Sequence, residues 1–596
     1  MFQDRLQALL IPALHGAFKQ LFGHELDGRS VGFQQTRPEF EGDVTINVFP
    51  FLKISGKGPE PTAQAIGEHL VSHVDVVERF NVVKGFLNIV IADAYWLGFL
   101  GETREQDILA FPANGKKVMV EYASPNTNKP LHLGHLRNIF LGWSVSRILE
   151  AAGHEVVRVQ VINDRGIHIC KSMVAWQKFG NGETPGSSGL KGDKLVGKYY
   201  VEFDKAYKAE VDALVATGKE KAVAEKEAPI LLEAQEMLRR WEAQDPEVRA
   251  LWRRMNGWVY DGFNATYDRI HVGFDKNYYE SDTYVLGKED VLKGLEKGVF
   301  FRKEDGSVWV DNTPEGLDEK VLLRSDGTSL YITQDIGTAI RRFEEFPGLS
   351  RMIYTVGNEQ DYHFKMLFII LKKLGFAWAD ELYHLSYGMV DLPSGKMKSR
   401  EGTVVDADDL IDEVVAEARA KGEEMSKLGD FTPAEKDDLF EMVGLAALKY
   451  FLLKVDPRKR MLFDPAASID LQGHTGPFIQ YTYARIRSLL RKAGETGNTW
   501  LPSAHLALST EERAVIKLLH QFPAVLNDAA VKLDPSALAN HTYELVKAYN
   551  TLYQTVPVLK EDDAAKRSFR LALSATVAAT VKKAMWCLGI EVPERM

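Results

Sequence analysis

One stretch of the chain decides its fold: Lys117-Val-Met-Val-Glu-Tyr-Ala-Ser-Pro-Asn-Thr-Asn-Lys-Pro-Leu-His-Leu-Gly-His135. Its opening residues, 117–121, are rich in apolar side chains and predict a buried strand. The Pro and Asn residues between 124 and 128 then interrupt that strand. From about Leu133 apolar residues recur at helical spacing as far as Leu149, and Gly153 ends the pattern. Because residues 156–162 predict a second strand, the sequence indicates a βαβ unit of a nucleotide-binding fold.

A pair of histidines, His132 and His135, stands at the start of the predicted helix. The free backbone N–H groups at a helix start, together with ring N–H groups, can hold a polyphosphate. Gly134 leaves room for a nucleotide to approach the backbone. Taken alone, so short a motif is equally compatible with one capping histidine beside a solvated one.

Composition bounds the remaining possibilities. A chain of 596 residues is too long for one core, so we expect about two to four domains. The net charge of -10 and the pI near 5.9 mean that any contact with RNA must come from local basic faces. Two cysteines far apart, Cys170 and Cys587, exclude a disulfide framework and favour a reducing compartment. With no signal-peptide pattern and no apolar run long enough to span a bilayer, we expect a cytoplasmic protein without a membrane partner.

The rest of the chain divides into further regions. Residues 1 to about 110 predict a small α/β module, and a Gly- and Ser-rich loop followed by charged, Ala-rich helices predicts an insertion near 180–290. The α/β pattern then returns, with short strands expected at 329–333 and 351–356 and a helix at 364–374. From about residue 430 onward helical periodicity dominates.

A second motif, Gly395-Lys-Met-Lys-Ser-Arg400, is a basic loop opened by glycine. Its lysines could neutralise negative charge that develops on a phosphate in a transition state. A solvated basic turn is the simpler interpretation of this motif in isolation.

Together the two motifs resemble the HIGH and KMSKS signatures of class I aminoacyl-tRNA synthetases, and the whole chain resembles the arginyl-tRNA synthetase family. The segment 121–126 before the histidines resembles the corresponding segment of that family. The first module, with Gly42-Asp43 and Asn47, resembles the family's extra N-terminal domain. Four further segments carry the resemblance: 331–335, 359–363, 476–487 and the chain ending 588–596.

The resemblance implies a multidomain α/β fold, with a Rossmann-like catalytic core built on a parallel sheet. It implies a tRNA-elbow-binding domain over 1–110 and a catalytic domain over 111–395. A signature-loop and stem-contact region would cover 396–473, and an all-helical anticodon-binding domain of the DALR type would cover 474–596. It also implies that ATP, as its Mg²⁺ complex, activates L-arginine, which then passes to the 3′ end of tRNA(Arg). No tightly bound cofactor or resident metal is expected, and the family's usual form is a monomer.

The resemblance also assigns site residues. Candidates for ATP contact and catalysis are His132, Gly134, His135, Lys129, Gly388, Met389, Val390, Lys396 and Lys398. Candidates for arginine binding are Glu121, Ser124, Asn126, His135, Tyr331, Asp335 and Gln360, because a guanidinium requires a facing carboxylate. Candidates for tRNA contact are Asn47, Tyr481, Arg485 and Arg487, the last three from a basic helix interleaved with tyrosines.

One position departs from the family pattern. The signature usually has a lysine as its fourth residue, where this chain has Ser399. Arginyl enzymes with that change generally have a lysine just before the histidine motif, and Lys129 stands there. We therefore assign Lys129 the compensating contact with phosphate.

Three alternatives stay open at this point. The first is another adenylyl- or nucleotidyltransferase with the same histidine motif, although such enzymes generally lack a large helical C-terminal domain. The second is a leucyl, valyl or isoleucyl synthetase, although those usually have a large editing insertion between the two motifs. The third is a synthetase-like RNA-binding protein without activity, for which Ser399 is the one degraded position we find.

Overall fold

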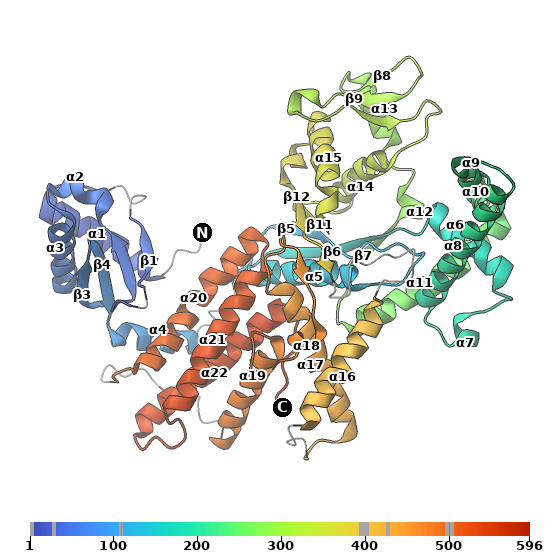
Figure 1. Ribbon diagram of the computed structural model, residues 1–596. Helices are drawn as coiled ribbons and strands as arrows, with labels where there is room; N and C mark the ends of the chain where they lie inside the picture. Colours follow the sequence, from blue (N-terminus) through green and yellow to red (C-terminus); the bar gives the residue numbers. More distant parts are fainter. Residues whose placement is uncertain are drawn as a thin grey trace.

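The computed structural model describes residues 5–26, 31–37, 39–105, 109, 111–391, 405–424, 429–470, 472–494, 500 and 506–596. Its first part is a small α/β domain, blue in Figure 1, with an antiparallel sheet of order β1-β2-β4-β3. Two longer helices, α1 and α3, pack together beside it. The elements are α1 (Arg5–Phe22), β1 (Phe33–Gln35), β2 (Val44–Asn47), α2 (Leu52–Ser55), α3 (Pro59–His73), β3 (Val77–Val83), β4 (Phe86–Ile91) and α4 (Asp93–Glu105).

The centre of the molecule is a parallel sheet of order β12-β11-β5-β6-β7. Its strands are β5 (Lys117–Glu121), β6 (Glu155–Ile162), β7 (Lys276–Tyr279), β11 (Leu349–Gly357) and β12 (Leu382–Tyr387), and every neighbouring pair is parallel. The middle of β5 is fully buried, as expected of a strand covered on both faces. The predicted βαβ unit is confirmed as β5, α5 (Leu133–Ala151) and β6.

The order of the strands determines where a ligand binds. The chain runs outward from β5 through β6 to β7, then returns to build β11 and β12 on the other side of β5. The two halves therefore diverge between β5 and β11. In open α/β sheets, ligands bind at this switch point, outside the carboxyl ends of the strands.

One predicted strand is wrong. Residues 329–333 do not form a strand; instead Ser329 makes an isolated bridge and α14 (Tyr331–Glu345) begins two residues later. The physical reason lies further along the chain, where Ile332, Ile336 and Ile340 recur at helical spacing and are all buried. The strand predicted at 351–356 lies within β11, and the helix predicted at 364–374 lies largely within α15 (Asp361–Lys373).

Two insertions extend the core, one on each side of β7. Between β6 and β7 the chain forms a helical unit, green in Figure 1: α6 (Ile167–Phe179), α7 (Pro185–Ser188), α8 (Gly192–Ala216), α9 (Lys221–Glu227), α10 (Pro229–Glu242) and α11 (Pro246–Arg269). Between β7 and β11 it forms α12 (Glu280–Thr283), α13 (Lys288–Glu296), a small antiparallel sheet of β8 (Phe301–Arg302), β9 (Val308–Val310) and β10 (Lys320–Leu323), and α14.

The last third of the chain is helical, as predicted. It contains α16 (Ala407–Glu424), α17 (Pro433–Leu453), α18 (Pro465–Ser468), α19 (Gly476–Lys492), α20 (Thr510–Lys532), α21 (Pro535–Thr555) and α22 (Ala564–Cys587), plus a short parallel pair, β13 (Val390–Asp391) with β14 (Met461–Leu462). The N-terminal domain packs on this helical region through α4 and α20. At that contact Arg513 of α20 pairs with Asp93, and both Arg513 and Lys517 pair with the buried Asp43.

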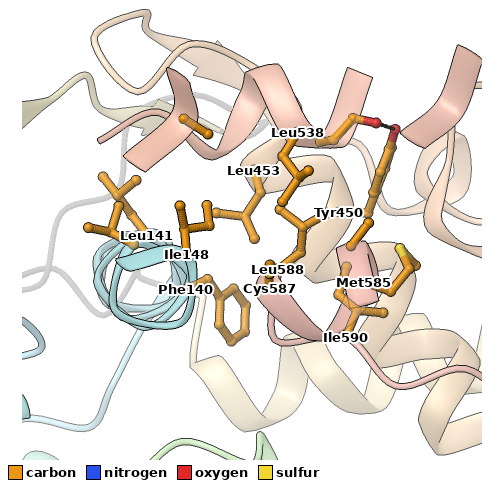
Figure 2. Packing of buried hydrophobic residues seen from close by; sticks show 14 of the residues in the cluster. Phe140, Leu141, Ile148, Tyr450, Leu453, Leu538, Met585, Cys587, Leu588 and Ile590 are labelled. Atoms are coloured by element: carbon orange, nitrogen blue, oxygen red, sulfur yellow. Dashed lines mark hydrogen bonds between the residues drawn. The ribbon is translucent and has the colours of Figure 1, made fainter. Parts of the chain in front are cut away.

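Helix α5 joins the sheet to the C-terminal helices. The sequence predicts one apolar face, but α5 is buried on nearly all sides, because the sheet covers one side and the helical domain the other. Figure 2 shows Phe140 and Ile148 of α5 on the side of the helix that faces Leu453 of α17 and, near the end of the chain, Cys587 and Leu588. The buried Lys449 of α17 holds the chain end beside this contact, because it donates to the carbonyls of Ile270 and Gly589, each at 2.7 Å. Among the described helices, none is both long and apolar enough to cross a membrane.

Candidate active site

The histidine pair closes the start of α5. His132 is the N-cap residue, and its ring Nδ1 accepts a hydrogen bond from the backbone N–H of Gly134 at 3.1 Å. In return, Nδ1 of His135 accepts from the backbone N–H of His132, also at 3.1 Å. The two rings lie with their centroids 3.8 Å apart. A Cβ at Gly134 would stand 3.0 Å from Cε1 of His132, so glycine is what allows this close packing.

These hydrogen bonds fix the chemical state of both rings. Burial, together with the charge of Lys129, lowers the pKa of His132 to about 3. Burial, followed by the charges of His132 and Lys129, lowers the pKa of His135 well below its ordinary value. Both rings are therefore neutral near pH 7, and because Nδ1 of each accepts, the proton sits on Nε2. The helix start thus presents Nε2–H donors suited to an anionic ligand.

Lys129 lies partly buried in the loop that leads to these histidines. Burial lowers the pKa of its ammonium group. It forms no hydrogen bond or ion pair with any other residue that the structure describes. A cation that lacks an acidic partner, beside a helix start, is arranged to receive an anion.

The chain between β5 and α5 is strained. Ala123 has a φ of 68° and Ser124 a φ of 45°, a left-handed conformation that costs roughly 1–3 kcal/mol for each residue that is not glycine. This bend points the Ser124 hydroxyl at Glu121, with Oγ 3.2 Å from Oε1, while Oγ also accepts from the N–H of Val161. Strained backbone of this kind is concentrated at functional sites.

The other oxygen of Glu121 is already paired. The fully buried Arg342 of α14 donates from Nη1 to Oε2 of Glu121 at 2.5 Å. Burial works to lower the pKa of Arg342, but the charge of Glu121 and its neighbours raises it overall. Glu121 therefore contributes less free negative charge to a ligand than its sequence position suggests.

A cleft of about 1030 Å³ opens beside α14 and α15, and its lining includes Arg165, Glu280, Tyr284, Tyr331 and His363. Tyr331 projects into solvent with 75% of its surface exposed. Asp335, one turn further along α14, pairs with Nε2 of His363 at 2.6 Å. The carboxylate of Glu280 has no hydrogen bond or ion pair within the described chain, although its backbone carbonyl accepts from the N–H of Tyr284. Its pKa is raised to about 7 by burial, with Arg165 acting to lower it and Asp164 and Asp335 to raise it.

The remaining candidates of the core lie around the switch point. Asn126 is exposed and pairs as an isolated bridge with Asn163, just after β6, and Gln360 is exposed directly after β11. On the β12 side, Sδ of Met389 lies 3.9 Å from the place a Cβ at Gly357 would occupy. A Cβ at Gly388 would stand 2.6 Å from the backbone of Lys459, so glycine is required there. Val390 is buried in β13.

Lys396, Lys398 and Ser399 lie outside the described residues. The chain on their far side is described from Val405. There the backbone of Asp406 forms an isolated antiparallel bridge with that of His132, and the N–H of Ala407 donates to the carbonyl of Leu131. The described residues that follow the second motif therefore lie against the first.

The candidates for RNA contact lie in two other places. Asn47 ends β2, where its Oδ1 accepts from the N–H of Phe49 at 3.0 Å. In the helical domain a hollow of about 540 Å³ between α19 and α21 is lined by residues that include Tyr481 and Arg485. Arg485 lies over the rings of Tyr481 and Tyr553 and donates to Asn550 at 2.6 Å. Arg487 instead donates to Glu594 near the chain end.

Sequence reasoning missed Arg342, Glu280 and Asn138, each of which has a signal in hindsight. Arg342 interrupts the buried face of a helix, which indicates a buried acidic partner. Glu280 directly follows β7, just as Glu121 ends β5, so both carboxylates meet the carboxyl edge of the sheet. Asn138 is a polar residue buried in the second turn of α5.

A histidine-capped helix at the switch point of a parallel sheet, joined to a C-terminal helical domain, defines a class I tRNA synthetase. The family model for tRNA synthetases class I (R), catalytic domain, matches residues 104–464, and the DALR anticodon binding domain matches residues 479–596. The arginine–tRNA ligase of Bacteroides thetaiotaomicron is 56% identical over 600 residues that span both chains completely. The chain belongs to the arginyl branch of the class I tRNA synthetase family.

Solved structures agree with this assignment. The arginyl-tRNA synthetase of Thermus thermophilus is 27% identical with a TM-score of 0.79, covering 99% of this chain and 100% of that one. That of Plasmodium falciparum shares the fold, with a TM-score of 0.75 at 20% identity and full coverage of both chains. The other transferase and the leucyl, valyl and isoleucyl alternatives are therefore set aside.

Proposed function

We infer that the chain ligates L-arginine to the 3′ end of tRNA(Arg), with ATP as the activating substrate. The observation that carries the inference is 56% identity along the whole chain to a protein named arginine–tRNA ligase. The cleft beside α14 gives it a physical basis, because Glu280 and Asp335 supply negative charge near an exposed tyrosine. A guanidinium is planar, permanently charged and rich in donors, so paired carboxylates suit it.

In the first step, a carboxylate oxygen of arginine attacks the α-phosphorus of ATP. The bond from that phosphorus to the bridging oxygen breaks, and pyrophosphate leaves with the electron pair, giving arginyl-adenylate. In the second step, a terminal ribose hydroxyl of the tRNA attacks the arginyl carbonyl carbon and gives up its proton, while the bond from that carbon to the phosphate oxygen breaks and AMP leaves with the electron pair. Neither step requires a protein nucleophile, so catalysis rests on positioning and electrostatics.

The residues at the helix start support the first step. We propose that the neutral rings of His132 and His135 donate from Nε2–H to the phosphates, while Lys129 adds a positive charge. ATP binds as its Mg²⁺ complex, and Gly388, Met389 and Val390 border the adenine. Lys396 and Lys398 of the second motif complete the phosphate contacts in this proposal.

The arginine substrate lies across the strained bend. Ser124, Asn126 and Gln360 are the proposed partners of its α-amino and carboxylate ends, together with His135. Tyr331 and Asp335 face the guanidinium, as does Glu280. Glu121 acts mainly through Ser124, because Arg342 neutralises its other oxygen.

In this proposal the tRNA contacts both the C-terminal helical region and the N-terminal domain. Residues 474–596 read the anticodon loop, and the hollow at Tyr481 and Arg485 suits an unstacked base, since aromatic rings stack on bases and arginine meets phosphate. The domain of residues 1–110, with Asn47, contacts the elbow. By family resemblance, arginine activation requires bound tRNA, and the enzyme acts as a cytoplasmic monomer.

Aminoacylation tests the inference. The purified protein is incubated with ATP, Mg²⁺, unfractionated tRNA and labelled arginine, and the label that precipitates with tRNA is counted. Labelled lysine is the matched control, because it has the same charge without the planar fork of donors. We expect labelling with arginine alone; labelling with lysine, or with neither, would overturn the inference.

The pH dependence of arginine use identifies Glu280. Its pKa of about 7 means that it becomes neutral as the pH falls from 8 to 6, and a neutral carboxyl attracts a guanidinium less. We expect kcat/KM for arginine to fall about tenfold over this range, as one ionisation near pH 7 requires. His132 and His135 contribute nothing here, because both stay neutral.

The Glu280→Gln variant is the control for this pH profile. Its kcat/KM should be low at pH 8 and nearly constant down to pH 6, since the titrating group is gone. If the decline persists in Glu280→Gln with the same midpoint, another group is responsible.

A further inference from the structure

A buried amide, Asn138, lies directly beneath the switch point of the sheet. It stands three residues after His135 on α5, and only 7% of its surface is exposed. Its Oδ1 accepts from the backbone N–H of Ala123 at 2.6 Å. Its Nδ2 donates to the carbonyl of Thr355 at 2.7 Å and to the hydroxyl of Tyr387 at 3.1 Å. Because an N–H stands on one side and a carbonyl on the other, the orientation of the amide is fixed.

These partners come from the neighbouring strands β5, β11 and β12 at their carboxyl ends. Ala123 follows β5, Thr355 lies in β11 and Tyr387 ends β12. Close packing allows one short side chain to reach all of them: a Cβ at Gly142, on the same face of α5, would stand 2.3 Å from Cβ of Tyr122. Asn138 therefore joins the two halves of the sheet where they diverge.

Two of these partners, Ala123 and Tyr387, are adjacent in sequence to residues of the proposed site, one on the arginine side and one on the ATP side. Ala123 is the first residue of the strained left-handed bend, and Ser124 follows it with the hydroxyl that contacts Glu121. A left-handed conformation at residues other than glycine persists only where the surroundings hold it. Tyr387 directly precedes Gly388, Met389 and Val390, which we propose to border the adenine.

We propose that Asn138 is a positioning residue that sets the arginine side and the ATP side of the site relative to each other. This inference rests on the proposed function. Asn138 touches neither substrate; it acts through the backbone of Ala123 and the hydroxyl of Tyr387. A displacement of about 1 Å in either partner misaligns the attacking carboxylate and the α-phosphorus, which can lower a rate by about 100-fold.

The test is a set of variants assayed at a temperature well below their unfolding. For Asn138→Ala we expect the KM for arginine and the KM for ATP both to rise about tenfold, and kcat to fall about 100-fold. Ser146→Ala is the matched control, because Ser146 is also buried on α5 but its hydroxyl bonds, among the described residues, only to Gly142 within the helix. We expect its kinetic constants to stay within about twofold of the parent.

A second substitution separates positioning from simple destabilisation. Glycine adopts a positive φ without strain, so Ala123→Gly removes the need to hold the bend. In the double variant with Ala123→Gly and Asn138→Ala, the KM for arginine should return most of the way to the parent value. The KM for ATP should stay raised, because the contact with Tyr387 is still missing. The inference fails if Asn138→Ala behaves like Ser146→Ala, or if Ala123→Gly recovers neither KM or recovers both equally.

The activity of the parent enzyme shows whether a negative result concerns the positioning role of Asn138 or the proposed function. If the parent protein does not charge tRNA with arginine, the proposed function is wrong. If the parent charges tRNA normally and the KM values of Asn138→Ala are unchanged, the positioning role alone is wrong.

Discussion

Replacing Asp335 with alanine is expected to raise the KM for arginine by about two to three orders of magnitude. When the guanidinium of arginine binds, it and the Asp335 carboxylate become a buried pair of opposite charges. Removing one partner of such a pair typically costs about 2–5 kcal/mol, much of it because the other charge is left unpaired. Asp335 stands on α14 one turn after Tyr331, which lines the same cleft as Glu280. Its carboxylate pairs with Nε2 of His363 at 2.6 Å.

Steady-state kinetics with saturating ATP and tRNA measure this effect. Asp335→Asn keeps the shape and removes the charge, so it should resemble the alanine variant if charge is what arginine requires. Asp305→Ala is the control, because Asp305 is an acid whose contacts lie within its own turn, with Ser307. An unchanged KM in Asp335→Ala would remove this residue from the arginine pocket.

Replacing Lys129 with alanine is expected to slow adenylate formation by about 10²–10³, with little change in the KM for arginine. That is the usual cost of removing one preorganised group that stabilises developing charge. Lys129 is partly buried, its pKa is lowered by that burial, and no acidic side chain in the described part of the chain pairs with it. A phosphate at the start of α5 would supply the missing partner.

Lys116→Ala is the matched control for this variant. Lys116 is an exposed lysine just before β5, at the opposite edge of the sheet from the switch point. Lys129→Arg, which keeps a cation, should recover part of the rate. If Lys129→Ala forms adenylate at close to the parent rate, Lys129 does not replace the lysine that is absent at Ser399.

Local pattern was sufficient to predict the centre of the fold. Apolar runs at β5 and β6, with helical spacing between them, specify a βαβ unit whatever the rest of the chain does. The same reasoning failed at residues 329–333, because five residues cannot distinguish a short strand from the first turn of a helix. Only the later isoleucines of α14, buried at helical spacing, decide that case.

The site could be predicted only in part, for a different physical reason. The residues near the histidine motif are close in sequence, and the chain places them together at one helix start. The partners that set the charges come from distant segments: Arg342 neutralises part of Glu121 across 221 positions. Asn138 and Thr355 are 217 positions apart. Such pairings follow from the order of strands in the sheet, which no local pattern specifies.

Pyrophosphate exchange into ATP tests the central claim most directly. The exchange is measured with each of the twenty amino acids, with and without total tRNA, because it reports adenylate formation and amino-acid choice together. We predict exchange with arginine and no other amino acid, and only when tRNA is present. Exchange with a different amino acid would contradict the arginine pocket at Glu280 and Asp335, and no exchange under any condition would contradict the assignment as an active ligase.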